Sequence, residues 1–484
     1  MKSAAWLALL LSVLSACSRG SHDASEDEES TGGSSSGGAG AQQLEPLPRD
    51  TEFALRPEFD GPCEKVKGAI DVNLGNSPEA FVRAANCQIT GNEPDAASVT
   101  ELSQQLRTVS YVRRVDVART LCMRAGSSCY FSYSDPWQAQ VDLTTPCTRK
   151  GTRDLGAVLM YWGECPNGVN CGLDWANTHS PGMATTSQLL GFGDLKTGFY
   201  NPKNAGFWRR ELLDARWSGL QFLLLNTFGP DLAQLPHVVE ALDDIGGGIQ
   251  VALFDDTWGW GKAASGDPWN QTPTFNDPDV AAPLIYKKWH QFYSAVPSKY
   301  WYRYQGRPLI AFYNAGTLNP QTKSAATLAK LRDLFKAEFG EDPFLAIDRA
   351  FFQDPATNDV ADAQFRWNTF QGGELSHSEM KGVTFDHFMA KWDTVGRENN
   401  GRLAAAGDNL VKGPELLDKY LAESESSNLA MMATWNDLGE GTGLTRNYDY
   451  YYQGAWLPPH AFMSRIRASR KFTLRKRLQL GQAS

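Results

Sequence analysis

Two acidic residues near the C-terminal end of the chain have types and spacing suited to proton-transfer chemistry. Asp437 and Glu440 lie three residues apart in the stretch ATWNDLGEGT, directly after an apolar run at residues 429–432. The glycines on either side of Glu440 allow the backbone to turn, so both carboxyl groups can face one cavity. One carboxylic acid can protonate a departing oxygen while the second carboxylate acts as base or nucleophile, as glycosidic bond cleavage requires. The alternative is structural, with Asp437 capping a turn and Glu440 on the surface. We predict that Asp437 and Glu440 are the catalytic pair.

Further polar and aromatic side chains lie at or after the ends of apolar runs from residue 162 onward. Carboxylates, amides and hydroxyls can bind sugar hydroxyls, and indole rings pack on the apolar faces of sugar rings. Helix caps, loop starts and buried core tryptophans are the ordinary alternatives. The predicted substrate-binding residues are Asn226, Asp255, Asp256, Trp258, Trp260, Tyr313, Trp435, Asn436, Trp162 and His179.

Metal and cofactor sites have little support in the sequence. Asp255, Asp256 and Asp348 carry ligand atoms that calcium accepts, but no calcium loop of recognised spacing contains them. Outside the Ser- and Gly-rich stretch at residues 18–50, no Cys-x-x-Cys pair, His-Glu-x-x-His helix, phosphate-binding Gly-Lys-Ser loop or Gly-x-Ser-x-Gly elbow occurs. We therefore predict no metal and no cofactor.

The elements that must position these residues alternate between short apolar runs and longer amphipathic stretches. This alternation favours an α/β fold with a parallel sheet, and eight runs favour a (β/α)8 barrel of the TIM type over residues 151–484. In such a barrel the active site lies at the C-terminal ends of the strands. The runs are residues 155–162, 220–226, 249–256, 308–314, 343–348, 363–369, 403–407 and 429–435.

Residues 51–150 carry a helical pattern and most of the cysteines. Ser77 and Pro78 are typical of a helix start, and residues 77–124 repeat apolar residues at helical spacing. We expect a small disulfide-containing helical domain, and the stretch PEAFVRAANCQITGNEPDAASVTELSQQL resembles a small helical module of exported bacterial proteins. Cys165 is expected to pair with Cys171, and the spacing offers Cys87 with Cys122 and Cys129 with Cys147.

The N-terminus has the pattern of an export signal. Lys2 precedes an apolar stretch at residues 6–16 that is too short to span a bilayer, and Leu-Ser-Ala-Cys ends it at Cys17. Residues 1–17 are thus predicted to be a lipoprotein signal peptide with Cys17 lipidated, against the alternative of a lone membrane-binding cysteine. Ser18 after the modified cysteine favours the outer membrane. Residues 18–50, rich in Ser, Gly and acids, are expected to form a solvated stalk.

Composition and charge narrow the class of partner. The chain is 42% hydrophobic and has a formal net charge of −9, which allows a large core and gives no electrostatic footprint for nucleic acid. A basic cluster at residues 465–477 is interpreted as a solvated helix end. We expect a monomer that contacts the membrane only through its N-terminal lipid and binds a polysaccharide or oligosaccharide.

The acidic motif resembles two families of glycoside hydrolases. TWNDLGEGT resembles the catalytic run of family 71, the α-1,3-glucanases, and is similar to the Asn-Glu-x-x-Glu run of the family 99 endo-α-mannosidases. ELLDARWSGLQFLLLN, GIQVALFDDTWGW and KYWYRYQGRPLIAFYNAG resemble three strand units of that barrel group. The resemblance implies that Glu440 is the general acid and Asp437 the base. It departs from family 71 at Gly441-Thr442, which replaces Ser-His, and from family 99 at Asp437, which replaces Glu.

These observations together predict a surface-anchored glycoside hydrolase that cleaves an α-linked glucan or mannan. Resemblance to family 71 implies inversion, whereas resemblance to family 99 implies retention assisted by the sugar's own 2-hydroxyl, so both outcomes stay open. The alternatives are a glycan-binding surface lipoprotein that has lost turnover and a structural or adhesive lipoprotein led by the helical module. The presence of both carboxylates favours the enzyme.

Overall fold

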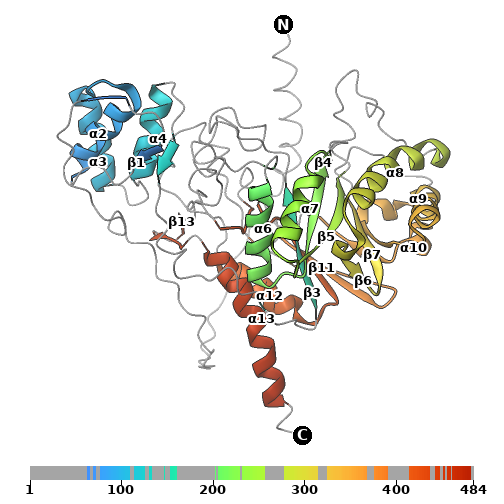
Figure 1. Ribbon diagram of the computed structural model, residues 1–484. Coiled ribbons are helices and arrows are strands. Elements are labelled where there is room, and N and C mark those ends of the chain that lie inside the picture. Colours follow the sequence, from blue (N-terminus) through green and yellow to red (C-terminus); the bar gives the residue numbers. More distant parts are fainter. Residues whose placement is uncertain are drawn as a thin grey trace, which may run out of the picture. The chain divides into compact units, whose positions relative to one another are not determined.

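The computed structural model describes the regular elements of the chain and the turns that join many of them (Figure 1). The described residues are 63–65, 69–71, 77–108, 114–125, 130–132, 147, 153–160, 202, 205–228, 232–256, 277–313, 324–367, 375–390, 414–436, 442–446, 451–452, 455–458 and 460–480.

Most described strands belong to one nearly closed barrel, which confirms the predicted TIM-type fold. Its strands follow the order β10-β11-β12-β3-β4-β5-β7-β8-β9, and every neighbouring pair is parallel except β10 with β11. The strands are β3 (Asp154–Met160), β4 (Phe222–Phe228), β5 (Gln250–Asp256), β7 (Arg307–Tyr313), β8 (Phe344–Asp348), β9 (Ala363–Phe365), β10 (Ser376–Met380), β11 (Val383–Phe388) and β12 (Leu429–Met432).

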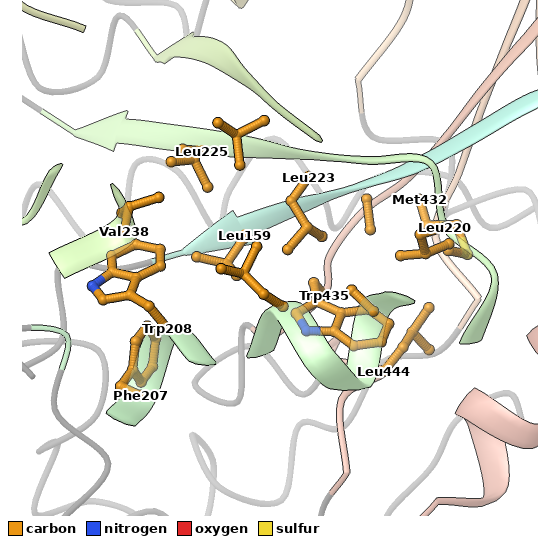
Figure 2. Close-up of a cluster of buried hydrophobic side chains, with 14 of the residues drawn as sticks. Leu159, Phe207, Trp208, Leu220, Leu223, Leu225, Val238, Met432, Trp435 and Leu444 are labelled. Carbon is orange, nitrogen blue, oxygen red and sulfur yellow. The ribbon is translucent and has the colours of Figure 1, made fainter. Parts of the chain in front are cut away.

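Helices surround this sheet and give each strand a second buried face. Because both faces are buried, the strands read as continuous apolar runs rather than as an alternating pattern. Leu223 and Leu225 of β4 belong to the same buried cluster as Phe207 and Trp208 of α6 (Ala205–Ser218), as Figure 2 shows, while Leu224 belongs to a separate cluster inside the barrel. The helices are α6 (Ala205–Ser218), α7 (Leu235–Asp244), α8 (Pro278–Ala295), α9 (Ser324–Phe339), α10 (Thr357–Val360), α12 (Pro414–Glu423) and α13 (Ala461–Leu480).

One barrel strand differs from the sequence-based prediction. The strand that precedes β12 in the sheet is β11, at Val383–Phe388, and the sequence pattern had suggested residues 403–407, which lie outside the described residues. β11 forms an antiparallel hairpin with β10 through a turn at Lys381 and Gly382, whose φ angles are 50° and 75°. Positive φ at both central residues is the geometry of a type I′ hairpin turn. Exposed and buried residues alternate along β10, so the hairpin lacks the continuous apolar run by which the other strands were predicted.

The N-terminal part contains the helices that the sequence predicted between residues 77 and 124. They are α2 (Pro78–Thr90), α3 (Ala96–Thr108) and α4 (Arg114–Arg124), which pack on one another through Phe81, Leu102 and Val117. The Ser77 side chain accepts a hydrogen bond from the Ala80 backbone nitrogen at 3.1 Å, and Pro78 occupies the first turn. Ser77 therefore caps the helix as predicted. Short strands β1 (Ala69–Asp71) and β2 (Tyr130–Ser132) pair in parallel beside them.

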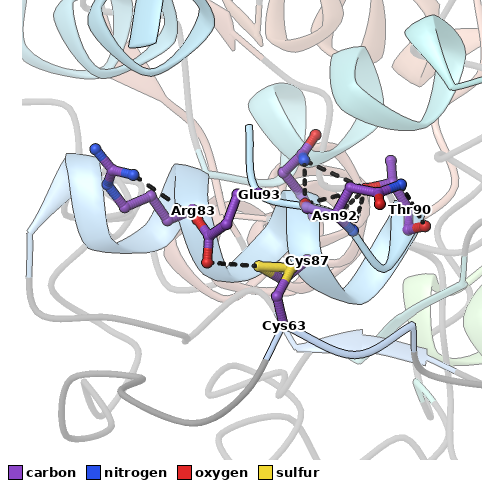
Figure 3. The surroundings of a disulfide bond; sticks show 7 residues. Cys63, Arg83, Cys87, Thr90, Asn92 and Glu93 are labelled. Carbon is purple, nitrogen blue, oxygen red and sulfur yellow. Dashed lines mark hydrogen bonds and ion pairs between the residues drawn. A yellow bond between two sulfur atoms is a disulfide. The ribbon is translucent and has the colours of Figure 1, made fainter. Parts of the chain in front are cut away.

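A disulfide in this part joins Cys63 to Cys87 (Figure 3), with the two Cα atoms 4.9 Å apart. The proposed pairing of Cys87 with Cys122 is therefore wrong. Cys147 is free, so its proposed pairing with Cys129 is wrong as well. Spacing in the sequence limits which cysteines can meet but does not determine connectivity, because packing of α2 brings Cys87 to a partner 24 residues away.

The remaining described elements are short. β6 (Arg303–Tyr304) pairs with β7, and β13 (Tyr451–Tyr452) pairs with β14 (Ala455–Trp456). Within the described residues, none of the helices combines the length and apolar character that crossing a bilayer requires.

Gly156 of β3 permits a close approach inside the barrel that no larger residue allows. A Cβ atom at this position would lie 2.3 Å from the Phe222 ring, and that ring is stacked on Tyr302 with centroids 3.9 Å apart. We expect Gly156→Ala to lower the free energy of unfolding by about 1–3 kcal/mol, because overpacking forces neighbouring side chains or backbone to move. Urea unfolding of Gly156→Ala, Phe222→Leu and the double variant measures this. If the ring causes the clash, the double variant loses less than the sum of the two single losses.

Candidate functional site

Seven inward-facing side chains form a layer at the C-terminal ends of the barrel strands, which we call the mouth layer. Alternate residues of a strand point to the same face, so each member shares the face of inner-core residues that precede it. The mouth layer consists of Met160, Asn226, Asp256, Tyr313, Asp348, Trp367 and His387.

Polar contacts join the first strands of this layer. Asn226 Nδ2 donates to Asp256 Oδ2 at 3.3 Å and lies 3.1 Å from Met160 Sδ. The other amide atom, Asn226 Oδ1, is buried and has no hydrogen-bond partner among the residues that the structure describes. The predicted binding residues Asn226 and Asp256 are therefore adjacent, and one strong acceptor beside them is unsatisfied.

Aromatic rings form the opposite part of the mouth layer. The Trp367 ring lies 5.0 Å from Tyr313 and 4.8 Å from His387, measured between ring centroids. Tyr313 and Trp367 are partly exposed, whereas His387 is fully buried. The predicted residue Tyr313 thus belongs to an aromatic surface whose other members come from β11 and from the residues that follow β9.

His387 combines complete burial with two unsatisfied ring nitrogens. Among the described residues, neither Nδ1 nor Nε2 has a partner with ordinary hydrogen-bond geometry, and the side chain has 0% exposure. Burial lowers the pKa of His387 to about 3, although the nearby Arg366 backbone favours the protonated form. The imidazole is therefore neutral at ordinary pH and offers one donor and one acceptor.

Asp348 is the mouth-layer carboxyl with the clearest electrostatic perturbation. Burial raises the pKa of Asp348 from 3.8 to about 6, against the lowering effect of backbone N–H groups. Those donors are the Ala350 nitrogen at 2.9 Å and the Trp367 nitrogen at 3.3 Å. Asp348 therefore holds the chain after β8 and the chain after β9 in place while it lies among the ring side chains.

Asp255 does not belong to the mouth layer, which corrects its predicted role in ligand binding. Its carboxylate is fully buried on the outer face of β5, where Lys288 Nζ lies 2.6 Å from Oδ1 and Trp289 Nε1 donates to Oδ2 at 2.9 Å. Because adjacent strand residues face opposite sides, Asp255 joins β5 to α8 while Asp256 faces the interior. The pair therefore does not supply adjacent ligands for a cation.

Trp435 and Asn436 also have structural positions. Trp435 is fully buried between α6 and the sheet (Figure 2), and its Nε1 donates to Glu211 Oε2 at 2.6 Å. Asn436 is fully buried too; Oδ1 accepts from the Met160 nitrogen at 2.6 Å, and Nδ2 donates to the Met160 carbonyl oxygen at 2.8 Å. Both side chains thus fix the chain after β12 instead of offering a surface to a ligand.

A buried ionic cluster holds the residues on both sides of the acidic motif. Glu211 of α6 accepts from Trp435, which precedes the two acids, and from Thr445 Oγ1, which follows them, the latter at 2.9 Å. Glu211 is also paired with Arg210, and Arg210 Nη2 donates to the Arg446 carbonyl oxygen at 2.6 Å. Arg446 Nε donates to Asp214 Oδ2 at 3.1 Å.

Backbone and hydroxyl contacts close the base of the same loop. The Leu444 and Thr445 nitrogens donate to the Trp435 carbonyl oxygen at 2.7 and 2.8 Å, and the hydroxyls of Thr434 and Thr442 are 2.7 Å apart. The Trp435 nitrogen donates to the Val158 carbonyl oxygen of β3 at 2.6 Å. Residues 437–441, between these flanks, lie outside the described residues. The start and the end of the motif are therefore fixed together beside the C-terminal end of β3.

Several predicted site residues lie outside the described residues, and their roles remain predictions. These are Asp437, Glu440, Trp162, His179, Trp258, Trp260, Cys17, Cys165 and Cys171.

Sequence reasoning missed His387 and gave Trp367 and Asp348 less weight than their positions merit. The sequence VTFDHF of β11 alternates, so the inward face of Val383, Phe385 and His387 is readable once this run is recognised as a barrel strand. Asp348 and Trp367 lie at or near the ends of the strands predicted at residues 343–348 and 363–369, so they carried the same signal as Asn226 and Asp256.

Comparison with known proteins places the chain in a family. Residues 215–479 match the family described as "Domain of unknown function (DUF5010)", a match that spans more than half of the chain. The chain belongs to this family. No curated protein matches it.

The chain is also similar in structure to solved glycoside hydrolases. A GH99 endo-alpha-mannosidase from Bacteroides thetaiotaomicron has a TM-score of 0.44 and 10% identity, with 66% of this chain and 97% of that chain covered. The same enzyme in complex with bis-tris-propane has a TM-score of 0.44, 11% identity and coverages of 67% and 98%. A glycoside hydrolase-like protein has a TM-score of 0.39, 10% identity and coverages of 67% and 96%. At these values the comparison adds nothing to the fold that the strand topology defines.

The buried cluster around Glu211 gives a stability prediction. We expect Glu211→Ala to reduce the free energy of unfolding by about 3–5 kcal/mol, because it leaves buried Arg210 without its adjacent carboxylate. Chemical denaturation measures the loss. Glu240→Ala, which removes an exposed carboxylate of α7, is the matched control and should change stability by less than about 0.5 kcal/mol. Similar small losses in both variants would contradict the structural role of Glu211.

Asp348 gives a prediction about pH. The folded chain keeps a proton on Asp348 up to about pH 6, while the unfolded chain releases it near the ordinary pKa of 3.8. Stability therefore decreases as the pH rises through this window, with a contribution of about 3 kcal/mol. In Asp348→Asn this contribution should disappear. Unfolding free energies measured from pH 4 to 7 test it: the difference between variant and parent should change across the window, and a constant difference would rule out the proposed titration.

Proposed function

We propose that the chain is a glycoside hydrolase that cleaves an α-linked polysaccharide, an α-glucan or an α-mannan, with Glu440 as general acid and Asp437 as base. The observation that carries this proposal is the anchoring of the acidic motif. Asn436, the residue before Asp437, is hydrogen-bonded to the backbone of Met160 of the mouth layer, and Thr442, two residues after Glu440, is hydrogen-bonded to Thr434. The motif thus departs from and returns to the face of the barrel where loops assemble active sites.

The mouth layer supports the same reaction class. Asp256, Asn226 and His387 can hydrogen-bond sugar hydroxyls, and the partly exposed rings of Tyr313 and Trp367 suit the apolar face of a sugar ring. Trp162, His179, Trp258 and Trp260 extend the proposed binding surface through the loops after β3 and β5. The reaction needs two carboxyl groups and a water molecule, so the proposal requires no metal or cofactor.

The proposal includes a cellular location for the enzyme. The signal sequence with Cys17 would tether the chain by lipid, and residues 18–50 would hold the helical part (51–150) and the barrel (151–484) away from the membrane. A monomer on the outer membrane would then meet polysaccharide outside the cell.

The test is release of reducing ends from a panel of α-glucans and α-mannans by the purified full-length chain. We expect Asp437→Asn and Glu440→Gln each to reduce the rate by about 100-fold or more, because each removes one of the proton-transfer groups. Asp418→Asn, a carboxylate of α12 that is paired with Arg465, is the control and should retain the parent rate. Release that survives both substitutions would reject the assigned pair. Binding of glycans without any release would favour a glycan-binding protein.

A further inference from the structure

We propose that the mouth layer binds one uncharged, hydroxyl-rich sugar ring, and that His387 and Asn226 make the hydrogen bonds that select it. This inference rests on the proposed function and specifies its substrate class, because it excludes acidic, sulfated and phosphorylated glycans. It starts from three buried polar atoms that have no hydrogen-bond partner among the described residues: Asn226 Oδ1 and the two ring nitrogens of His387.

Unsatisfied polar atoms inside a barrel are costly. Leaving a buried donor or acceptor without a partner costs about 1–3 kcal/mol, so most native structures avoid it. His387 has two such atoms at 0% exposure, and Asn226 Oδ1 is a third at 1% exposure of its residue. Both side chains face the same end of the barrel. A ligand that forms hydrogen bonds with these atoms removes this free-energy cost, so the gain adds to its binding affinity.

The chemical types of these atoms define the ligand. Neutral His387 presents one donor and one acceptor, and a hydroxyl group, which can both donate and accept, complements either nitrogen. Asn226 Oδ1 is an acceptor and needs a donor. The other polar atom of the amide, Asn226 Nδ2, donates to the adjacent Asp256 carboxylate at 3.3 Å. Asn226 Oδ1 is therefore directed away from that contact. Sugar hydroxyl groups can therefore satisfy either residue.

The charges of the described mouth-layer residues disfavour an anionic ligand, although the positive charge of Arg366 acts on Asp348. The mouth layer contains two carboxyl groups, Asp256 and Asp348, and no cationic side chain, and Lys288 is directed to Asp255 on the outer face. Arg349 and Arg366 follow β8 and β9 but are exposed at the rim. A carboxylate, sulfate or phosphate placed beside Asp256 would be desolvated next to a like charge, which is strongly unfavourable.

Aromatic rings define how the ligand approaches. Trp367 is partly exposed and lies against the His387 ring, and Tyr313 lies against Trp367. These rings form the accessible side of the mouth layer, so a sugar ring would pack its C–H face on them while its hydroxyls reach His387 and Asn226.

The test measures binding of neutral and acidic polysaccharides to the full-length chain, in the Glu440→Gln background so that cleavage does not intervene. The probes are α-mannan and a soluble α-glucan as neutral polymers and polygalacturonate as the acidic polymer, in affinity electrophoresis. We expect retention by a neutral polymer only. His387→Phe should weaken it about tenfold, since loss of a hydrogen bond leaves a ligand hydroxyl unsatisfied. His387→Gln, which restores a neutral donor and acceptor, should recover part of the affinity. Asn226→Leu should weaken retention independently.

The matched control is His377→Phe, on the partner strand β10 of the same hairpin, where the side chain is exposed and paired with Asp386 at 2.7 Å. It should bind as the parent does. Unchanged affinity in folded His387→Phe and Asn226→Leu, equal retention of polygalacturonate, or no retention of any probe would each overturn the inference. Release of reducing ends by the parent chain with an unchanged KM in His387→Phe would overturn the inference and leave the hydrolase intact. Binding that depends on His387, without any release of reducing ends by the parent chain, would reject the hydrolase and keep the inference about the mouth layer.

Discussion

Burial of both faces of each barrel strand is the constraint on which the site depends. Successive side chains of a strand enter different environments, so neighbours in the sequence acquire unrelated roles. Asp255 and Asp256 show this directly, because one is neutralised by Lys288 beneath α8 while the other faces the interior beside Asn226. If β5 were shifted by one residue, Asp256 would face the helices and Asp255 would face the barrel interior, out of reach of Lys288. The alternation of side chains between the two faces of each strand thus determines both the packing of the helices and the residues of the mouth layer.

The cluster around Glu211 extends this order to the loop after β12. Ionic groups are costly to bury, and they persist here because each is bound to several partners from different parts of the chain. Glu211 contacts residues before and after the acidic motif, so α6 determines where the loop starts and where it ends. A loop closed at its base has fewer conformations to lose when its carboxyl groups take up positions around a substrate. This anchoring of the described flanks supports the proposal that Asp437 and Glu440 act as a pair.

Much of the barrel was predictable because buried parallel strands have a strong sequence signal. β3, β4, β5, β7, β8, β9 and β12 all coincide with apolar runs, although their ends differ by a few residues. β11 was missed because it belongs to a hairpin whose other strand, β10, is partly exposed, so the pair lacks a continuous apolar run. Trp435 and Asn436 illustrate the second limit. Their position beside the acids suggested ligand contacts, but burial and partner choice depend on Glu211 and Met160, which are more than 200 residues away.

The free protein carries unsatisfied atoms in the mouth layer, and this has a consequence for specificity. A site that already satisfied His387 and Asn226 internally would gain little from a ligand hydroxyl, because binding would only exchange one hydrogen bond for another. A site that leaves them unsatisfied discriminates strongly, since a ligand that lacks the right hydroxyl leaves the cost in place. The neutral state of His387 matters for the same reason: a charged imidazolium would lose its acceptor and would attract anions. Burial of the ring, which lowers its pKa to about 3, keeps the site suited to uncharged hydroxyl groups over the whole ordinary pH range.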